Sequence, residues 1–289
     1  MSTDSDKIST IEKALGKLGP LSESRNGANF IRSTTSSEST DSESGFNQSS
    51  PADVDIDLGL LQEKGMVLPH MSYTKIAEEY RSIKRPILIR MSESESGEKM
   101  NLIMVTSSIP GEGKSFTAVN LAMSIAMELD RTVLLVDADI TKSDIPKLFG
   151  INAEAGLINV LEDNETKLEN VLLRTNIPKL TILPAGQYTD NSAELFASAK
   201  MTALLREMAE RYSDRVIIFD TPPVLASSEP SIIGNLVGQI VFVTEAENTQ
   251  QKIVKEALSK LDPDKITGLV LNKCNQRIRT DQTYGYYSG

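Results

Sequence analysis

The sequence predicts an α/β fold in which helices cover both faces of a mainly parallel sheet. Largely apolar runs of strand length recur along the chain after residue 130, at residues 133–136, 180–183, 216–219, 240–243 and 266–271. Helical patterns at 193–212 and 250–261 lie between some of these runs. Buried strands that alternate with helices are typical of parallel sheets covered on both sides.

The composition limits the class of protein. The chain has 289 residues, a formal net charge of −10 and 39% hydrophobic residues, enough for one large domain with extra segments. The negative charge argues against nucleic-acid binding, and no apolar run is long enough for direct membrane insertion. One cysteine, Cys274, has no intramolecular disulfide partner, which is typical of the cytoplasm. One histidine, His70, makes histidine-based metal chemistry an unfavoured explanation.

The first 71 residues are expected to lie outside the main domain. An amphipathic helix is predicted within residues 1–20, because four apolar residues share one helical face: Ile8, Ile11, Leu15 and Leu18. Its apolar face either docks on a partner or packs on the main domain. Residues 21–71 are rich in Ser, Asp and Glu and are predicted to be a disordered linker, although 54–67 are compatible with an irregular strap.

The main domain is expected to span residues 72–273, followed by a flexible tail over 274–289 that contains tyrosines. Ser72 is the predicted N-cap of the first helix of this domain. The apolar residues of that helix recur at helical spacing, at Ile76, Tyr80, Ile83 and Ile87. Pro86 is expected to kink or end it.

A phosphate-binding loop is predicted at the start of the domain, in the stretch VTSSIPGEGKSFTAVNL from residue 105 to 121. An apolar strand precedes the loop and a helical pattern follows it. Glycines allow successive backbone N–H groups to face an anion, and the helix adds its positive N-terminus. Lys114 would reach the β- and γ-phosphates of ATP, and the Ser115 hydroxyl would bind Mg²⁺. The residues expected to contact the nucleotide are Ser108, Pro110, Gly111, Glu112, Gly113, Lys114, Ser115 and Phe116.

This motif predicts a P-loop NTPase, although Ser108 replaces the first glycine of the G-x-x-x-x-G-K-[ST] pattern. Two apolar strands end in acids: LLVDAD in Asp137 and Asp139, and VIIFDTPP in Asp220. Carboxylates at the ends of buried strands can hold Mg²⁺ or orient a nucleophile, and N-capping of the next helix is the alternative. Asn272 ends a further strand, where its amide would read adenine or merely complete a turn.

Together these residues resemble the bacterial tyrosine kinases, the P-loop autokinases that regulate exopolysaccharide assembly. SSIPGEGKS is similar to their Walker A motif, VLLVDAD to Walker A′ and VIIFDTPP to Walker B. LPAG followed by NSAEL and the terminal YGYY also match the family. ISTIEKALGKLG and EEYRSIKRPIL most resemble the exosortase (PEP-CTERM)-associated branch.

The resemblance implies a role for each matching residue. Lys114 would neutralise the migrating phosphoryl group, and the metal would be held by Ser115, Asp139 and Asp220. Asp137 would activate the tyrosine hydroxyl, although the choice between Asp137 and Asp139 as base stays open. The phosphate acceptors would be three tyrosines of a neighbouring subunit: Tyr284, Tyr286 and Tyr287.

The resemblance also implies partners. A homo-oligomer that can close into a ring would form through Glu78, Arg81 and Lys84, which stand where the family has E-x-x-R-x-x-R. A separate transmembrane chain-length (co-polymerase) protein would activate the kinase and hold it at the inner face of the plasma membrane. The arginine that usually ends the Walker A′ box is replaced by Thr141, with Lys142 beside it.

The competing hypothesis is a non-kinase ATPase switch, like the partition and septum-positioning ATPases. Those proteins carry an extra lysine early in the phosphate loop, and residues 105–113 contain none. They often end in a basic amphipathic helix, whereas this chain ends in tyrosines. Both differences favour the kinase.

Overall fold

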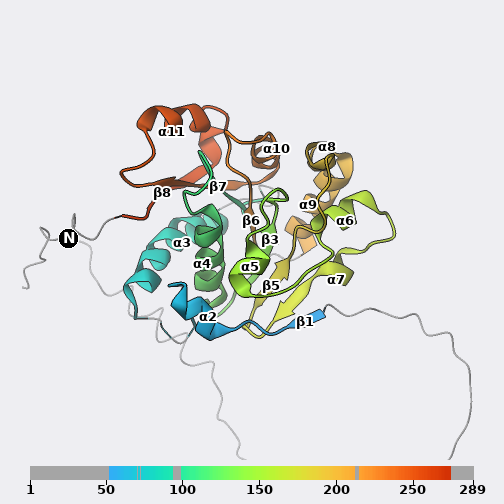
Figure 1. Ribbon diagram of the computed structural model, residues 1–289, viewed down its shortest axis with the longest axis horizontal. Coiled ribbons are helices and arrows are strands. Elements are labelled where there is room, and N and C mark those ends of the chain that lie inside the picture. The colour runs from blue at the N-terminus through green and yellow to red at the C-terminus, as the bar shows by residue number, and fades with distance from the viewer. Residues whose placement is uncertain (1–51, 70, 72, 94–98, 212–214, 275–289) are drawn as a thin grey trace, which may run out of the picture. The chain divides into compact units, whose positions relative to one another are not determined.

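The computed structural model describes residues 52–69, 71, 73–93, 99–211 and 215–274, whose strands form one eight-stranded sheet (Figure 1). The order across the sheet is β1-β4-β5-β3-β6-β2-β7-β8. The strands are β1 (Ala52–Val54), β2 (Leu102–Ser107), β3 (Thr132–Asp137), β4 (Leu173–Thr175), β5 (Leu180–Leu183), β6 (Arg215–Asp220), β7 (Gln239–Glu245) and β8 (Ile266–Asn272).

The sheet is parallel except where β4 pairs with β5. All the apolar runs predicted to be strands are strands, and the predicted parallel P-loop architecture is confirmed. β2 lies between β6 and β7, and β3 lies on the other side of β6. The phosphate loop and both acidic strand ends therefore share one edge of the sheet (Figure 1).

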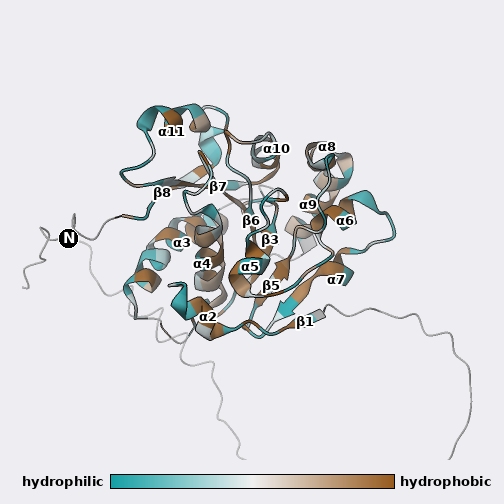
Figure 2. Cartoon of the chain, viewed as in Figure 1, coloured by the Kyte–Doolittle hydropathy of each residue, from teal (hydrophilic) through white to brown (hydrophobic). Residues whose placement is uncertain are grey.

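Helices cover both faces, as the sequence predicts. One face packs against α2 (Leu58–Glu63), α3 (Lys75–Glu93), α4 (Lys114–Ala126) and α5 (Ile145–Phe149). The other packs against α6 (Leu157–Glu162), α7 (Leu168–Val171), α8 (Ser192–Phe196), α9 (Ala199–Arg211), α10 (Glu229–Leu236) and α11 (Gln251–Leu258). Strand residues alternate between the two cores: Ile103 and Val105 face the first, Leu102 and Met104 the second. Figure 2 accordingly shows brown, hydrophobic residues along much of the central strands and of α4.

Residues 52–69 are an ordered strap, so the prediction of a disordered linker as far as residue 71 is wrong for this stretch. β1 extends the sheet, and Leu61 and Leu68 are completely buried. The backbone N–H of Val67 donates to Oδ1 of Asn120 on α4 at 2.6 Å. The strap folds because its few apolar residues complete a core that the rest of the domain provides. The predicted N-terminal helix lies outside the described residues.

Helix α3 differs from the prediction at both ends. Its first turn is capped by the hydroxyl of Thr74, which accepts from the N–H of Ala77 at 3.3 Å, and Ser72 lies outside the described residues. Pro86 does not end the helix. It is exposed, so the carbonyl that loses its helical partner faces solvent, while Tyr80 and Ile87 are buried on the inner face.

The single helix predicted over residues 193–212 is two helices, α8 and α9. No helix among the described residues is both long and apolar enough to cross a membrane.

Candidate active site

The phosphate loop joins β2 to α4, and Lys114 is the first residue of that helix. Gly111 and Gly113 have φ angles of 94° and 96°, a region that L-residues with side chains rarely adopt. These two conformations let the loop curl around the N-terminus of α4, where free N–H groups and the helix dipole favour an anion.

The loop is held from outside by the side chain of Glu112, which is 1% exposed. One carboxylate oxygen accepts from the N–H of Ile109 within the loop at 2.8 Å. The other accepts from the hydroxyl of Thr244, near the end of β7, at 3.1 Å and from that of Thr249, on the segment that follows β7, at 2.6 Å. The Glu112 side chain therefore shapes the loop rather than facing a nucleotide. The sequence gives no signal for these hydrogen bonds of Glu112, because the two threonines lie more than 130 positions further along the chain.

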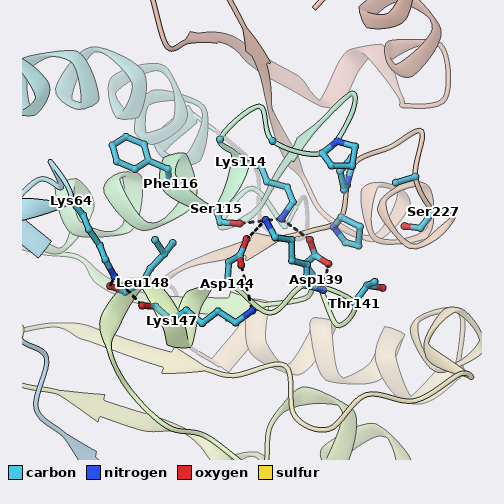
Figure 3. A pocket seen from close by; sticks show the side chains of 17 residues that line it. Lys64, Lys114, Ser115, Phe116, Asp139, Thr141, Asp144, Lys147, Leu148 and Ser227 are labelled. Atoms are coloured by element: carbon cyan, nitrogen blue, oxygen red, sulfur yellow. Dashed lines mark hydrogen bonds and ion pairs between the residues drawn. The ribbon is translucent and has the colours of Figure 1, made fainter. Parts of the chain in front are cut away.

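Lys114 lies among the predicted acids, and Figure 3 shows it beside one of them, Asp139. Its Nζ is 2.7 Å from Oδ2 of Asp139 and 3.4 Å from Oδ1 of Asp220, and it donates to the Ser115 hydroxyl at 3.0 Å. Asp137 and Asp220 are register partners on β3 and β6. Adjacent strand ends thus bring all four predicted catalytic residues together.

The buried acids have shifted pKa values. Burial raises the pKa of Asp137 to about 8, with a further contribution from the charge of Asp220. Burial also raises the pKa of Asp220 to about 6, although Lys114 opposes the shift. Burial acts to lower the pKa of Lys114, but the charges of Asp220 and Asp139 outweigh it and hold that pKa above its usual value. The site therefore keeps a cation at Lys114 beside carboxylates that bind protons unusually well.

Asp137 is also held in place by Ser143, whose hydroxyl donates to its Oδ2 at 2.7 Å. The N–H of Asp139 donates to its Oδ1 at 3.2 Å. Sequence reasoning missed Ser143, since a serine six positions after an aspartate matches no motif.

A pocket of about 570 Å³ opens beside Lys114. The phosphate loop and the first turn of α4, with Ser115 and Phe116, line part of it. The segment after β3 lines another part of the pocket, where Asp144 forms ion pairs with Lys142 at 3.0 Å and with Lys147 at 3.7 Å; Figure 3 shows Asp144 and Lys147 there. Lys64 of the strap also reaches this pocket, where its Nζ donates to the carbonyls of Lys147 and Leu148.

The residues present fit Mg²⁺ and a polyphosphate. Oδ2 of Asp220 and the hydroxyl of Ser108 are buried and have no hydrogen-bond partner in the described part of the chain. Carboxylate and hydroxyl oxygens are ligands that Mg²⁺ prefers. No group of three His, Cys, Asp or Glu side chains among the described residues is placed to hold a metal by itself. Mg²⁺ would therefore need phosphate oxygens to complete its coordination, as is usual for nucleotide sites.

Two predicted site residues, Asn272 and Lys84, make contacts that differ from the expectation. Nδ2 of Asn272 donates to the carbonyl of Glu112 at 2.8 Å, so this part of the amide is committed to the phosphate loop. Lys84, predicted to contact another subunit, is 8% exposed and pairs with Glu128 at 2.6 Å inside the chain. Glu78 and Arg81 pair with each other on the surface of α3. The predicted acceptors Tyr284, Tyr286 and Tyr287 lie outside the described residues.

Comparisons with known proteins agree with this geometry. A family model described as ParA, NUBPL iron-transfer P-loop NTPase, matches residues 98–283. The tyrosine-protein kinase YwqD of Bacillus subtilis is 34% identical over 214 residues, which cover 73% of this chain and 86% of the relative. The tyrosine-protein kinase ptk of Acinetobacter johnsonii is 33% identical over 68% of this chain, which spans only 26% of that relative's length.

The kinase domain of the Escherichia coli tyrosine kinase ETK has a similar structure. The TM-score is 0.62 at 26% identity, and the match covers 78% of this chain and 98% of that domain. Sequence and structure therefore place the chain with one group of P-loop enzymes. The chain belongs to the bacterial tyrosine kinases.

Proposed function

We propose that the protein is an ATP-dependent autokinase that transfers the γ-phosphate of ATP to tyrosines of a neighbouring subunit. The acceptors would be Tyr284, Tyr286 and Tyr287. The observation that carries this proposal is the convergence of Lys114 with three strand-end carboxylates beside a pocket large enough for polyphosphate, which Lys114 and Asp139 line. Phosphoryl transfer needs this kind of site, because its catalysis is mostly positioning and charge stabilisation.

Each residue has a defined task in this reaction. The N–H groups of the loop bind the β- and γ-phosphates, and Lys114 exchanges its pairing with Asp139 for one with the γ-phosphate. Mg²⁺, held by Ser115, Asp139 and Asp220, would neutralise charge on the phosphates. The acceptor hydroxyl oxygen forms a bond to the γ-phosphorus as the bond to the leaving β-phosphate oxygen breaks.

Asp137 is the proposed base that receives the proton of the tyrosine hydroxyl. Asp139 is less suitable, because its Oδ2 is paired with the cation of Lys114 at 2.7 Å, whereas the oxygens of Asp137 accept from neutral donors, the Ser143 hydroxyl and the N–H of Asp139. Only the deprotonated form of Asp137 accepts this proton. A pKa of about 8 makes that form a stronger base than an ordinary carboxylate, closer to the pKa near 10 of tyrosine, and makes it more abundant as pH rises toward 8. Ser143 keeps one of its carboxylate oxygens in a fixed direction.

The test is incubation of the purified full chain with radiolabelled ATP and Mg²⁺. Wild type should carry label on tyrosine, and Lys114→Met should lose it. Lys260→Met, on an exposed turn beyond α11, is the control for the loss of a lysine. Phosphate release without labelled protein would contradict the proposal and favour the ATPase switch.

The biological setting is part of the same proposal. We infer a role in exopolysaccharide chain assembly or export, at the inner face of the plasma membrane, with a transmembrane chain-length protein as activator. Residues 1–20 offer the simplest docking element for that protein. Deletion of these residues should abolish membrane recruitment in cells that contain the activator, and unchanged recruitment would contradict this docking site.

The protein is proposed to assemble through the surface of α3, as a ring or smaller oligomer, before its tyrosines are phosphorylated. Glu78 and Arg81 carry this proposal, since both are on the helix surface. Kinship with the exosortase-associated branch stays a prediction from the N-terminal sequence.

A further inference from the structure

The outer side of the phosphate loop is fastened to the end of β8. Nδ2 of Asn272 donates to the carbonyl oxygen of Glu112 at 2.8 Å. Nζ of Lys273 donates to the carbonyl oxygen of Gly111, also at 2.8 Å, and is paired with Glu245 of β7 at 3.0 Å. Two successive carbonyls of the loop are therefore bound by two successive side chains.

These contacts decide which way the loop's N–H groups point. In a trans peptide the C=O and N–H bonds lie in one plane and point in opposite directions. Holding the carbonyl of Gly111 outward therefore turns the N–H of Glu112 inward. Holding the carbonyl of Glu112 does the same for the N–H of Gly113. Inward N–H groups are the ones that bind phosphate.

The loop needs such a restraint because its own backbone does not supply one. Gly111 and Gly113 lack the side chains that would limit rotation of the peptides beside them. We call the contacts of Asn272 and Lys273 with the carbonyls of Glu112 and Gly111 the clamp. A Cβ on Gly113 would lie 2.0 Å from Nδ2 of Asn272, so only glycine at this position leaves room for the clamp.

Lys273 itself is held in an unusual conformation. Its φ angle is 56°, in the left-handed region that costs free energy for a residue with a side chain. The turn brings its Nζ back to the loop immediately after β8 ends. The strained backbone of Lys273 is consistent with a functional role for the contact between its Nζ and the carbonyl of Gly111.

We propose that Asn272 and Lys273 are positioning residues that hold the phosphate loop in its anion-binding shape. The inference rests on the proposed nucleotide site and adds to it a part of the chain outside the Walker motifs. It also implies that the point where the tyrosine tail leaves the sheet is tied to the loop that binds the donor phosphate.

The experiment measures equilibrium binding of a fluorescent ADP analogue, and its displacement by pyrophosphate, to the full chain. Lys273→Met and Asn272→Ala should each weaken binding about threefold or more, and the double variant about tenfold. Pyrophosphate has phosphates but no adenine, so a weaker phosphate site should lower its affinity together with that of ADP. Lys273→Arg should restore most of the affinity, and Lys260→Met should match wild type.

Thermal melting separates the clamp from general damage. Lys273→Gly should melt higher than Lys273→Ala, because glycine relieves the positive φ, yet both should bind ADP as weakly as Lys273→Met. A double variant that binds ADP and pyrophosphate within twofold of wild type would overturn the inference. Loss of ADP affinity alone in Asn272→Ala would overturn the role of Asn272 and indicate an adenine contact. Failure of wild type to bind ADP would instead contradict the nucleotide site itself.

Discussion

At the scale of single residues, lysines with the same charge serve opposite purposes. Lys114 is paired with Asp139 and Asp220, and the proposed reaction requires that it exchange this pairing for the γ-phosphate. Lys84 is bound by a backbone carbonyl, that of Ser124 at 2.7 Å, and by Glu128. Its surroundings are those of a structural cation.

We therefore expect Lys84→Met to lower the free energy of unfolding by about 1–2 kcal/mol, since it leaves a buried carbonyl without its donor. Arg85→Met, at the exposed neighbouring position, should change it by less than about 0.5 kcal/mol. Urea denaturation measures both. A Lys84→Met protein of wild-type stability but weaker self-association would contradict the structural role and show that Lys84 contributes to the subunit interface.

Tyr80 makes stability depend on alkaline pH. Burial raises its pKa to about 12, above the unfolded value near 10. The neutral tyrosine is favoured in the fold, so its contribution is complete below pH 10 and is lost as pH rises from 10 through 12. Relative to Tyr80→Phe, wild type should lose up to about 2.7 kcal/mol across this window.

Urea denaturation of both proteins between pH 9 and 11.5 measures that difference. The other tyrosines and the lysines titrate in both proteins and cancel. If the free energies of unfolding of the two proteins differ by the same amount at every pH, the Tyr80 hydroxyl ionises as readily in the fold as in the unfolded chain.

At the scale of elements, the strap shows how little sequence signal an ordered segment needs. Its buried residues contribute to a core whose other side is α4 and the sheet. Leu61→Ala and Leu68→Ala should each cost about 2–4 kcal/mol, since both side chains are fully buried. Truncation of residues 1–47 should leave the melting temperature within a few degrees of wild type.

Calorimetry of the three variants tests this assignment. Leucine variants as stable as wild type would mean that the strap does not contribute to the core. A large loss of stability on removing residues 1–47 would place part of the core N-terminal to the strap.

The sequence was sufficient for the central strands and their acids, because each is a continuous apolar run ending at a polar residue. It was insufficient for β1 and β4, which have only three residues each and depend on pairing for their structure. It was also insufficient for contacts such as Glu112 to Thr249 or Ser143 to Asp137. Those depend on where loops meet in space, which no local pattern encodes.

At the scale of the whole molecule, charge governs assembly. The chain carries a formal net charge of −10, and phosphorylation of Tyr284, Tyr286 and Tyr287 would add roughly five more negative charges. We expect the phosphorylated protein to self-associate more weakly and to lose this difference at high salt. Sedimentation should distinguish it from a Tyr284/Tyr286/Tyr287→Phe variant, and identical sedimentation would contradict the switch.

The strand order has a consequence for synthesis of the protein. The phosphate loop is complete by residue 115, but both neighbours of β2 in the sheet are made later, and Asp220 follows Lys114 by 106 positions. A chain emerging from the ribosome therefore carries the Walker A sequence long before it has a site. A ligand stabilises only the state that binds it. A nucleotide would therefore stabilise the finished domain and not such a nascent chain.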